Sequence, residues 1–287
     1  MKTQEKKNAV SNLVSLVRVR SVGYLNAAPL EWGLERKTGE GIIVKRESPA
    51  GCLAALREER ADVGLVPSAG YEGRWRAVPD VAIASDGAAE SVLLAGRAEA
   101  PDMKRVALDT ASRTAAALVK VLFRERWGSE PDYVEAPAEG AVEDETFDGV
   151  LVIGDPALHL PLREGGSPVE GSGGNSPFPH VYDLGAEWKA LTGLPFVFAF
   201  WAGREDLPVH VVRLLQKAKE EGRGHLRELA ERYARTHSRG ADFYEHYLRD
   251  AIRYDWTPRE TEGLAAFWRL AEKHEVIPKA PRLSFYE

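Results

Sequence analysis

Short apolar runs rich in β-branched residues alternate along this chain with longer stretches whose apolar residues recur at helical spacing. This alternation is typical of βαβ units, in which mainly parallel strands form a sheet and helices cover its faces. The predicted strands span residues 17–22, 42–47, 63–66, 81–85, 91–96, 105–108, 132–135, 150–153, 181–183 and 196–202. The pattern therefore predicts an α/β fold.

Several helices are expected to begin at recognisable caps. The clearest are Ser48 before Pro49, Asp155 before Pro156, and Thr257 with Pro258 and Glu260. In each, a polar residue that caps free amides precedes a proline whose fixed φ suits the first helical turn. From residue 208 to 274 no strand pattern is visible, so a helical C-terminal third is expected. The stretch 163–180, rich in Gly, Ser and Pro, predicts a surface loop.

At 287 residues, the chain is longer than a typical single hydrophobic core supports. We expect it to divide into two lobes with a cleft between them. The expected division assigns residues 1–95 to the first lobe and 96–195 to the second, while 196–287 return to the first lobe and end in helices.

Charge and cysteine content exclude several classes of function. The formal net charge of -6 gives no basic field for phosphate backbones, so we expect no nucleic-acid partner. Cys52 is the only cysteine, which excludes an intrachain disulfide and a Cys-based metal cage, and it is expected to be buried. The His residues are dispersed, and no Walker loop, dinucleotide fingerprint, nucleophile elbow or His-Glu-x-x-His motif occurs. No metal site is therefore predicted.

The first residues bear on secretion. Basic residues precede an apolar stretch as in a signal peptide, but Glu5 offsets their charge, Ser11 and Ser15 interrupt the apolar run, and no small-x-small cleavage site follows. No run of about eighteen apolar residues, the length that spans a bilayer, occurs in the chain. The sequence therefore predicts a cytoplasmic protein that does not span a membrane, and it leaves the oligomeric state open.

Polar residues stand at the carboxyl ends of several predicted strands, which is where open α/β sheets bind ligands. Asn26 follows the first strand and Ser68 follows the third. Each is also a preferred helix N-cap, so capping and ligand binding both stay open. Asp86 and Gly87 fall where a turn alone would explain them.

The sharpest anion site is predicted directly after residues 105–108. Ser112 and Thr114 bring hydroxyls to the start of a helix. Arg113 could pair with a carboxylate, although an exposed arginine in a first helical turn is often only solvated. Asp155 is interpreted mainly as a helix cap, with ligand binding second.

Ordered sequence blocks carry a family resemblance. They are Tyr24-Leu25-Asn26 with Pro29-Leu30, Asp62-Val63-Gly64-Leu65-Val66 with Ser68 and Tyr71, Ser85-Asp86-Gly87 with Ser91-Val92, and Asp183-Leu184-Gly185 through Pro195-Phe196-Val197. In this order they resemble the chorismate dehydratase family of the futalosine route to menaquinone, from about residue 18 to 204 and more weakly through the helical tail. The chain departs from the family at Ala88-Ala89, where Pro-Val is usual, which leaves the shape of that turn open.

The resemblance implies a two-lobed periplasmic-binding-protein type II-like α/β fold with an interlobe cleft and a helical C-terminal region. It implies conversion of the small dianion chorismate to 3-[(1-carboxyvinyl)oxy]benzoate plus water, without a metal or an organic cofactor. It gives Asn26 as the central catalytic contact, and the expected substrate contacts are Ser68, Ser85, Gly87, Ser91, Ser112 and Thr114. Arg113 and Asp155 are added to the expected substrate contacts because each lies at a predicted helix start after a strand.

The motifs contain no obvious general base for removing a proton from the substrate. No His or Glu stands out in them, and the amide of Asn26 has no useful pKa for proton transfer. We hypothesise that the substrate's own enolpyruvyl carboxylate removes the C3 proton while Asn26 orients the reacting groups, with Asp86 as the rival base. Two other functions stay open: a non-catalytic protein that binds a small anionic solute, which shares the fold, and the related enzyme that cleaves cyclic dehypoxanthine futalosine.

Overall fold

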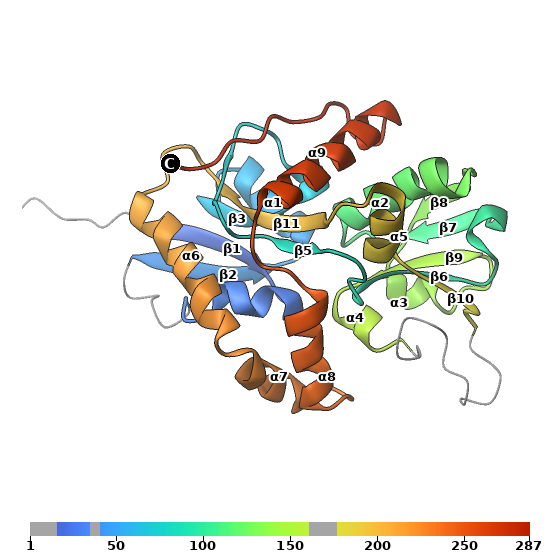
Figure 1. Cartoon of the computed structure of the whole chain (residues 1–287), viewed down its shortest axis with the longest axis horizontal. Coiled ribbons are helices and arrows are strands. Elements are labelled where there is room, and N and C mark those ends of the chain that lie inside the picture. The colour runs from blue at the N-terminus through green and yellow to red at the C-terminus, as the bar shows by residue number, and fades with distance from the viewer. Residues whose placement is uncertain (1–15, 35–40, 161–176) are drawn as a thin grey trace, which may run out of the picture.

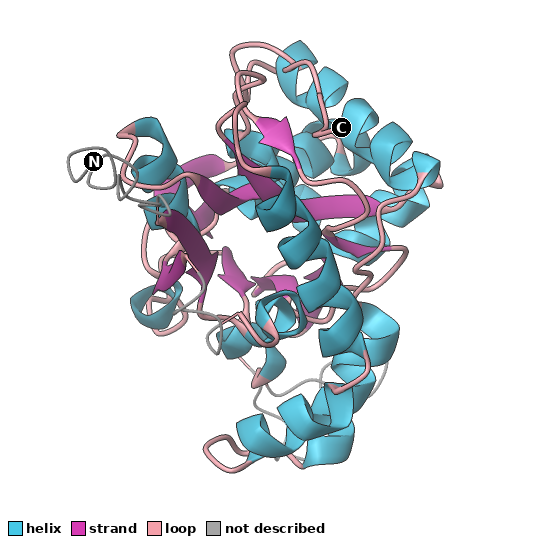
Figure 2. Ribbon diagram, turned by 90° about the vertical axis from the view of Figure 1, so that its left-hand side faces the viewer, coloured by secondary structure: helices cyan, strands magenta, loops and turns pink. Residues whose placement is uncertain are grey.

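The computed structural model describes residues 16–34, 41–160 and 177–287. Two β-sheets lie side by side, each with its own helices, and form the two lobes (Figure 1). A view from the side shows helices flanking the strands (Figure 2). The leader considered for secretion and most of the loop predicted at 163–180 lie outside the described residues.

The first lobe contains a 6-stranded sheet in the order β2-β1-β3-β11-β4, with β5 pairing β11. Its strands are β1 (Val17–Val22), β2 (Ile42–Glu47), β3 (Val63–Pro67), β4 (Arg76–Ala77), β5 (Ile83–Ser85) and β11 (Phe196–Gly203). The first three strands run parallel, and β11 returns antiparallel to β3. β3 is buried along its whole length, because the sheet is covered on both faces.

The second lobe contains a 5-stranded sheet in the order β10-β6-β9-β7-β8. Its strands are β6 (Val92–Gly96), β7 (Arg105–Leu108), β8 (Asp132–Glu135), β9 (Gly149–Ile153) and β10 (His180–Asp183). β6 pairs only with β9 and β10, both within this sheet. The chain therefore crosses between the sheets before residue 92.

Helices fill the intervals between strands and form the C-terminal third. The first part of the chain contributes η1 (Leu25–Glu31), α1 (Pro49–Arg57), η3 (Ser68–Gly70), η4 (Ala100–Asp102), α2 (Arg113–Leu122), η5 (Phe123–Trp127), α3 (Ala138–Ala141), α4 (Asp155–Leu158) and α5 (Leu184–Thr192). The rest contributes α6 (Val209–Arg223), α7 (Leu226–Ala234), α8 (Ala241–His246), η6 (Tyr247–Ala251) and α9 (Pro258–Lys273). Within the described ranges, no helix is long and apolar enough to cross a membrane.

Two predicted helix starts are confirmed and one is wrong. The Ser48 side chain accepts a hydrogen bond from the Gly51 amide, and Thr257 forms a complete capping box with Glu260. Asp155, predicted as a cap, is instead the first residue of α4, and Gly154 is the cap. The cause is a tertiary contact of the Asp155 carboxylate, described below.

The two lobes are joined by paired crossings. The chain leaves β5 for the second lobe and comes back through β11, and Ser85 of β5 lies opposite Phe196 of β11 in an antiparallel ladder. Helix α9 packs against both β11 and α2, so it contacts both lobes (Figure 1). The junction therefore consists of the paired strands β5 and β11, and helix α9 packs against both lobes beside it.

Candidate active site

A cavity of about 70 Å³ lies between the lobes. The first lobe contributes Tyr24, Asn26, Pro67 and Phe198 to its walls. The second lobe contributes Ser112, Thr114 and Gly154, together with Ser91, which directly precedes β6. Six of these residues follow or end strands β1, β3, β7 and β9, at the sheet edge where open α/β folds bind ligands, whereas Phe198 lies within β11 and Ser91 precedes β6. Most of the wall is apolar and a few polar groups converge on it, which is typical of a small-molecule site.

Asn26 lies in η1, directly after β1. Its Oδ1 atom is buried and has no hydrogen-bond partner in the part of the chain that the structure describes. A buried carboxamide oxygen without a partner is unfavourable, because it has lost its water without a replacement. The cavity therefore offers an acceptor that a ligand or an ordered water can satisfy.

The start of α2 forms another wall. Ser112 caps this helix by accepting a hydrogen bond from the Ala115 amide at 3.2 Å. Thr114 Oγ1 accepts a hydrogen bond at 3.1 Å from the amide of Ala69, which belongs to the first lobe. Since both hydroxyls act as acceptors, each keeps its own hydrogen to donate. Together with the unpaired amides of a helix start, they suit a carboxylate.

Ser91 is buried at the entry to β6 and also lines the cavity. The phenol of Tyr247, from η6, donates a hydrogen bond to Ser91 Oγ at 2.8 Å. Sequence reasoning missed Tyr247, because an aromatic residue at helical spacing near the C-terminus looks like any other core residue. Nothing short of the tertiary structure distinguishes it.

Several predicted contacts do not line this cavity. The Ser68 hydroxyl donates to the Val197 carbonyl at 2.6 Å, and the Ser85 hydroxyl donates to the Gly87 carbonyl at 3.0 Å. The helix expected to begin at Ser68 is only the short η3. Gly87 lies in the crossing turn with a φ of 135°, and Arg113 is exposed. In the described structure, the Ser68 and Ser85 side chains therefore bond backbone carbonyls, and the Arg113 side chain faces solvent.

Asp155 connects the lobes instead of capping its own helix. Its Oδ1 accepts a hydrogen bond at 3.0 Å from the amide of Leu25, the first residue of η1. Because η1 has no side-chain cap of its own, the second lobe supplies one. Asp155 thus orients the element that carries Asn26.

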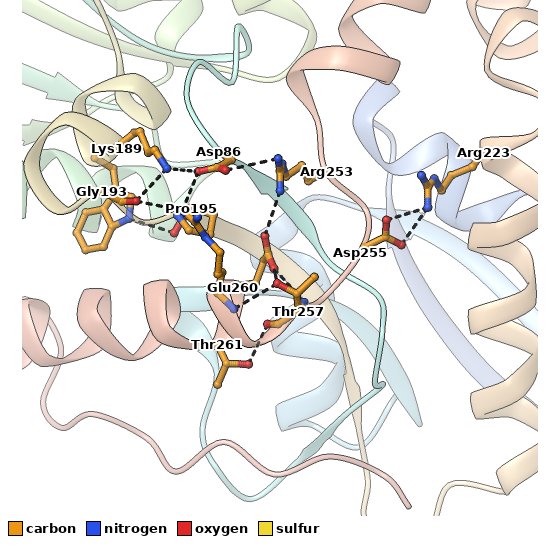
Figure 3. A network of polar contacts seen from close by, with 12 residues as sticks. Asp86, Lys189, Gly193, Pro195, Arg223, Arg253, Asp255, Thr257, Glu260 and Thr261 are labelled. Atoms are coloured by element: carbon orange, nitrogen blue, oxygen red, sulfur yellow. Dashed lines mark hydrogen bonds and ion pairs between the residues drawn. The ribbon is translucent and has the colours of Figure 1, made fainter.

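Asp86, the rival base, lies at the crossing between the lobes. Its carboxylate bonds Lys189 Nζ at 2.5 Å and faces Arg253 at 3.4 Å (Figure 3). Arg259 lies 3.7 Å from the same carboxylate. Burial acts to raise the pKa of the Asp86 carboxyl, but Lys189 and the arginines outweigh it, and the pKa lies below its usual range. Asp86 does not line the cavity. Its role here is to fasten the junction.

The cavity lining carries almost no titratable chemistry. Tyr24 is the only titratable side chain among the lining residues of the described ranges, and burial, with Asp109 and Asp155 nearby, raises its pKa to about 12. No carboxylate, imidazole or amine lines the cavity there. Nor is any group of three or more His, Cys, Asp or Glu residues placed to hold a metal ion in those ranges.

Comparison with solved structures establishes the fold. A protein from Archaeoglobus fulgidus matches 91% of this chain and 98% of its own with a TM-score of 0.69 and 18% identity. The alkanesulfonate-binding protein from Xanthomonas axonopodis matches 93% of this chain and 96% of its own with a TM-score of 0.66 and 14% identity. The chain has the periplasmic-binding-protein-like α/β fold that the resemblance implied.

Sequence comparison establishes the family. A curated chorismate dehydratase from Thermus thermophilus is 35% identical over 265 residues, which cover 85% of this chain and 91% of that protein. The family model described as menaquinone biosynthesis matches residues 17–273. The chain therefore belongs to the menaquinone biosynthesis family, as its resemblance to the chorismate dehydratases indicated.

Proposed function

We propose that this protein removes water from chorismate, forming 3-[(1-carboxyvinyl)oxy]benzoate. The 35% identity to a chorismate dehydratase over most of both chains supports this reaction. At the level of the site, one observation carries the proposal: a single interlobe cavity is lined by Asn26, Ser91, Ser112 and Thr114. We infer that Asn26 is the central catalytic contact and that the three hydroxyls bind substrate.

The arrangement suits a ring that carries carboxylates. The start of α2, with Ser112 and Thr114, would hold one carboxylate by neutral donors and the helix dipole. The C3 proton of chorismate is vinylogous to the ring carboxylate, so its removal gives a dienolate-like intermediate whose charge spreads onto that carboxylate. Donors that are already oriented toward this charge lower the barrier to proton loss.

The lining favours the substrate as its own base. The enolpyruvyl carboxylate would take the C3 proton, leaving the electron pair of the C–H bond in the dienolate. That pair then forms the aromatic ring and expels the C4 hydroxyl, which leaves with the proton as water. The elimination balances without an oxidant or reductant. Because Asp86 is paired at the lobe junction and does not line the cavity, it is a poor candidate for this step.

The first experiment is incubation of the purified full chain with chorismate. We expect a product lighter by one water in the mass spectrum, together with benzoate-type absorbance. Chorismate that binds but is recovered intact would instead identify a non-catalytic solute-binding protein. A cytoplasmic location and the lack of a nucleic-acid partner stay predictions.

The role of Asn26 has its own test. We expect Asn26→Ala to lower kcat by about 100-fold and to change KM much less, as when an oriented polar group of a transition-state site is removed. Gln216→Ala is the matched control, because the Gln216 amide bonds the Pro79 carbonyl, away from the cavity. Near-normal turnover of Asn26→Ala would remove Asn26 from the mechanism.

A further inference from the structure

Tyr247 brings a buried hydroxyl to the cavity from the C-terminal helices. The residue is 1% exposed in η6, a π-helical turn that follows α8. Its hydroxyl donates to Ser91 Oγ at 2.8 Å, across 156 residues of sequence. Tyr247 does not itself line the cavity, so it reaches the site only through the side chains that do.

Asn26 lines the same cavity, and its Oδ1 atom is buried without a hydrogen-bond partner among the described residues. This oxygen can therefore accept a hydrogen bond from a ligand.

The hydrogen bond from Tyr247 constrains the Ser91 hydroxyl. A serine hydroxyl has one hydrogen, and Ser91 Oγ already accepts the hydrogen of Tyr247. Its own hydrogen therefore points elsewhere, and in the described structure its acceptor is the Ala89 carbonyl at 3.3 Å. A ligand carboxylate accepts such a hydrogen more strongly than a distant carbonyl does. Tyr247 thus keeps Ser91 available as a donor.

We propose that Tyr247 is a positioning residue that sets Ser91 as a hydrogen-bond donor to the substrate, beside the Asn26 acceptor. This inference rests on the proposed dehydration of chorismate. The C4 hydroxyl, the group that leaves, is the one hydrogen-bond donor of the chorismate dianion, and every other polar group of the dianion accepts. The Asn26 Oδ1 acceptor is therefore matched to the C4 hydroxyl, and the Ser91 donor is matched to a carboxylate.

The test removes one oxygen atom. Tyr247→Phe keeps the buried ring and deletes the hydroxyl, and we expect kcat to fall about tenfold or more while KM changes less than about threefold. Tyr254→Phe is the matched control. Tyr254 is 3% exposed and follows η6 closely, and its hydroxyl has no partner among the described residues. We expect the control to keep kcat within about twofold of wild type.

Two further measurements separate positioning from a general structural effect. In a Ser91→Ala background, Tyr247→Phe should lower kcat little further, because Tyr247 acts through the Ser91 hydroxyl and residues that act through one another are not additive. The pH dependence of kcat should keep its shape in Tyr247→Phe, since Tyr247 transfers no proton in this scheme.

The outcomes distinguish this inference from the proposed function. The positioning role would be overturned if Tyr247→Phe had the same kcat as Tyr254→Phe. It would also be overturned if Tyr247→Phe caused its full loss of kcat in the Ser91→Ala background. A wild-type protein that leaves chorismate intact would instead overturn the proposed function. A lowered melting temperature of Tyr247→Phe at unchanged kcat would assign Tyr247 to stability alone.

Discussion

Ser91, Ser112 and Thr114 offer hydroxyls to the cavity, and within the described ranges no cationic side chain lines it. Neutral donors hold a carboxylate less tightly than an arginine would. Chorismate and its proposed product carry the same carboxylates, so a strong cationic clamp would hold both tightly, whereas hydroxyls and helix amides can still stabilise the charge that develops on the ring carboxylate. At the residue scale, the site suits turnover better than tight storage of an anion.

Asp62 illustrates a residue that supports the fold and not the chemistry. Its carboxylate accepts hydrogen bonds from the Arg18 backbone amide at 2.7 Å and from the Arg18 guanidinium at 3.0 Å. Burial acts to raise the pKa of Asp62, but the bonds and charge of Arg18 and the charge of Arg204 outweigh it, so the pKa lies below its usual 3.8. Stability from Asp62 is therefore present above about pH 4 and is lost as the pH falls through the lowered pKa.

We expect Asp62→Asn to lower the free energy of unfolding by about 1 kcal/mol at pH 7, and the difference from wild type to shrink below pH 4. Urea unfolding at a series of pH values measures both. Asp206→Asn is the control: the Asp206 side chain is 76% exposed and pairs with Arg204, so its effect should be small. A difference that grows on acidification would contradict the assignment.

At the scale of elements, η1 and α6 form the support of Asn26. Gly222 of α6 lies against Pro29 of η1, and a Cβ at Gly222 would approach the Pro29 carbonyl oxygen to 2.0 Å. Because the obstacle is backbone, no side-chain rotation relieves it. The contact explains how a short 3₁₀ helix stays in place: α6 covers it from outside and Asp155 caps it from the other lobe.

We expect Gly222→Ala to destabilise the fold by about 1–3 kcal/mol through overpacking, and to lower kcat because η1 must shift. Thermal unfolding and steady-state kinetics measure these effects. Gly140→Ala, in a helix where a Cβ meets nothing within 4 Å, should leave both nearly unchanged. Wild-type stability for Gly222→Ala would show that α6 can move away without loss.

At the scale of the whole molecule, the lobes touch through a few specific contacts. The Ala69 amide bonds Thr114, and the Leu25 amide bonds Asp155. Gly154 lies against the ring of Tyr24: a Cβ there would come within 2.8 Å of Tyr24 Cδ1, and the φ of Gly154 is 65° with a ψ of -146°. Only glycine adopts that conformation without strain.

We expect Gly154→Ala to hold the lobes apart and to raise KM for chorismate about tenfold or more, because a Cβ against the Tyr24 ring disfavours the approach of the lobes that binding needs. Steady-state kinetics measure this, and small-angle scattering should show a larger radius of gyration. Gly240→Ala, in open space with a φ of -74°, is the control. An unchanged KM for Gly154→Ala would mean that closure does not need this contact.

The sequence by itself determined the local structure and the type of chemistry. Strand runs such as 42–47 and 105–108 were predicted as observed, because β-branched periodicity acts over a few residues. The caps at Ser48 and Thr257 followed for the same reason. The hydroxyl-rich start of α2 predicted an anion site. Ser112 and Thr114 do line the cavity, and anion binding there stays a prediction.

Only the tertiary structure decided which polar groups share the cavity. Ser68 and Ser85 look like ligand contacts in sequence, yet their hydroxyls bond nearby carbonyls. The Asp155 carboxylate accepts a hydrogen bond from the Leu25 amide of η1 instead of capping its own helix. Tyr247, from the C-terminal helices, bonds Ser91 at the cavity. The physical reason is that propensity and capping depend on neighbours in sequence, whereas the direction of a side chain depends on partners brought together by packing.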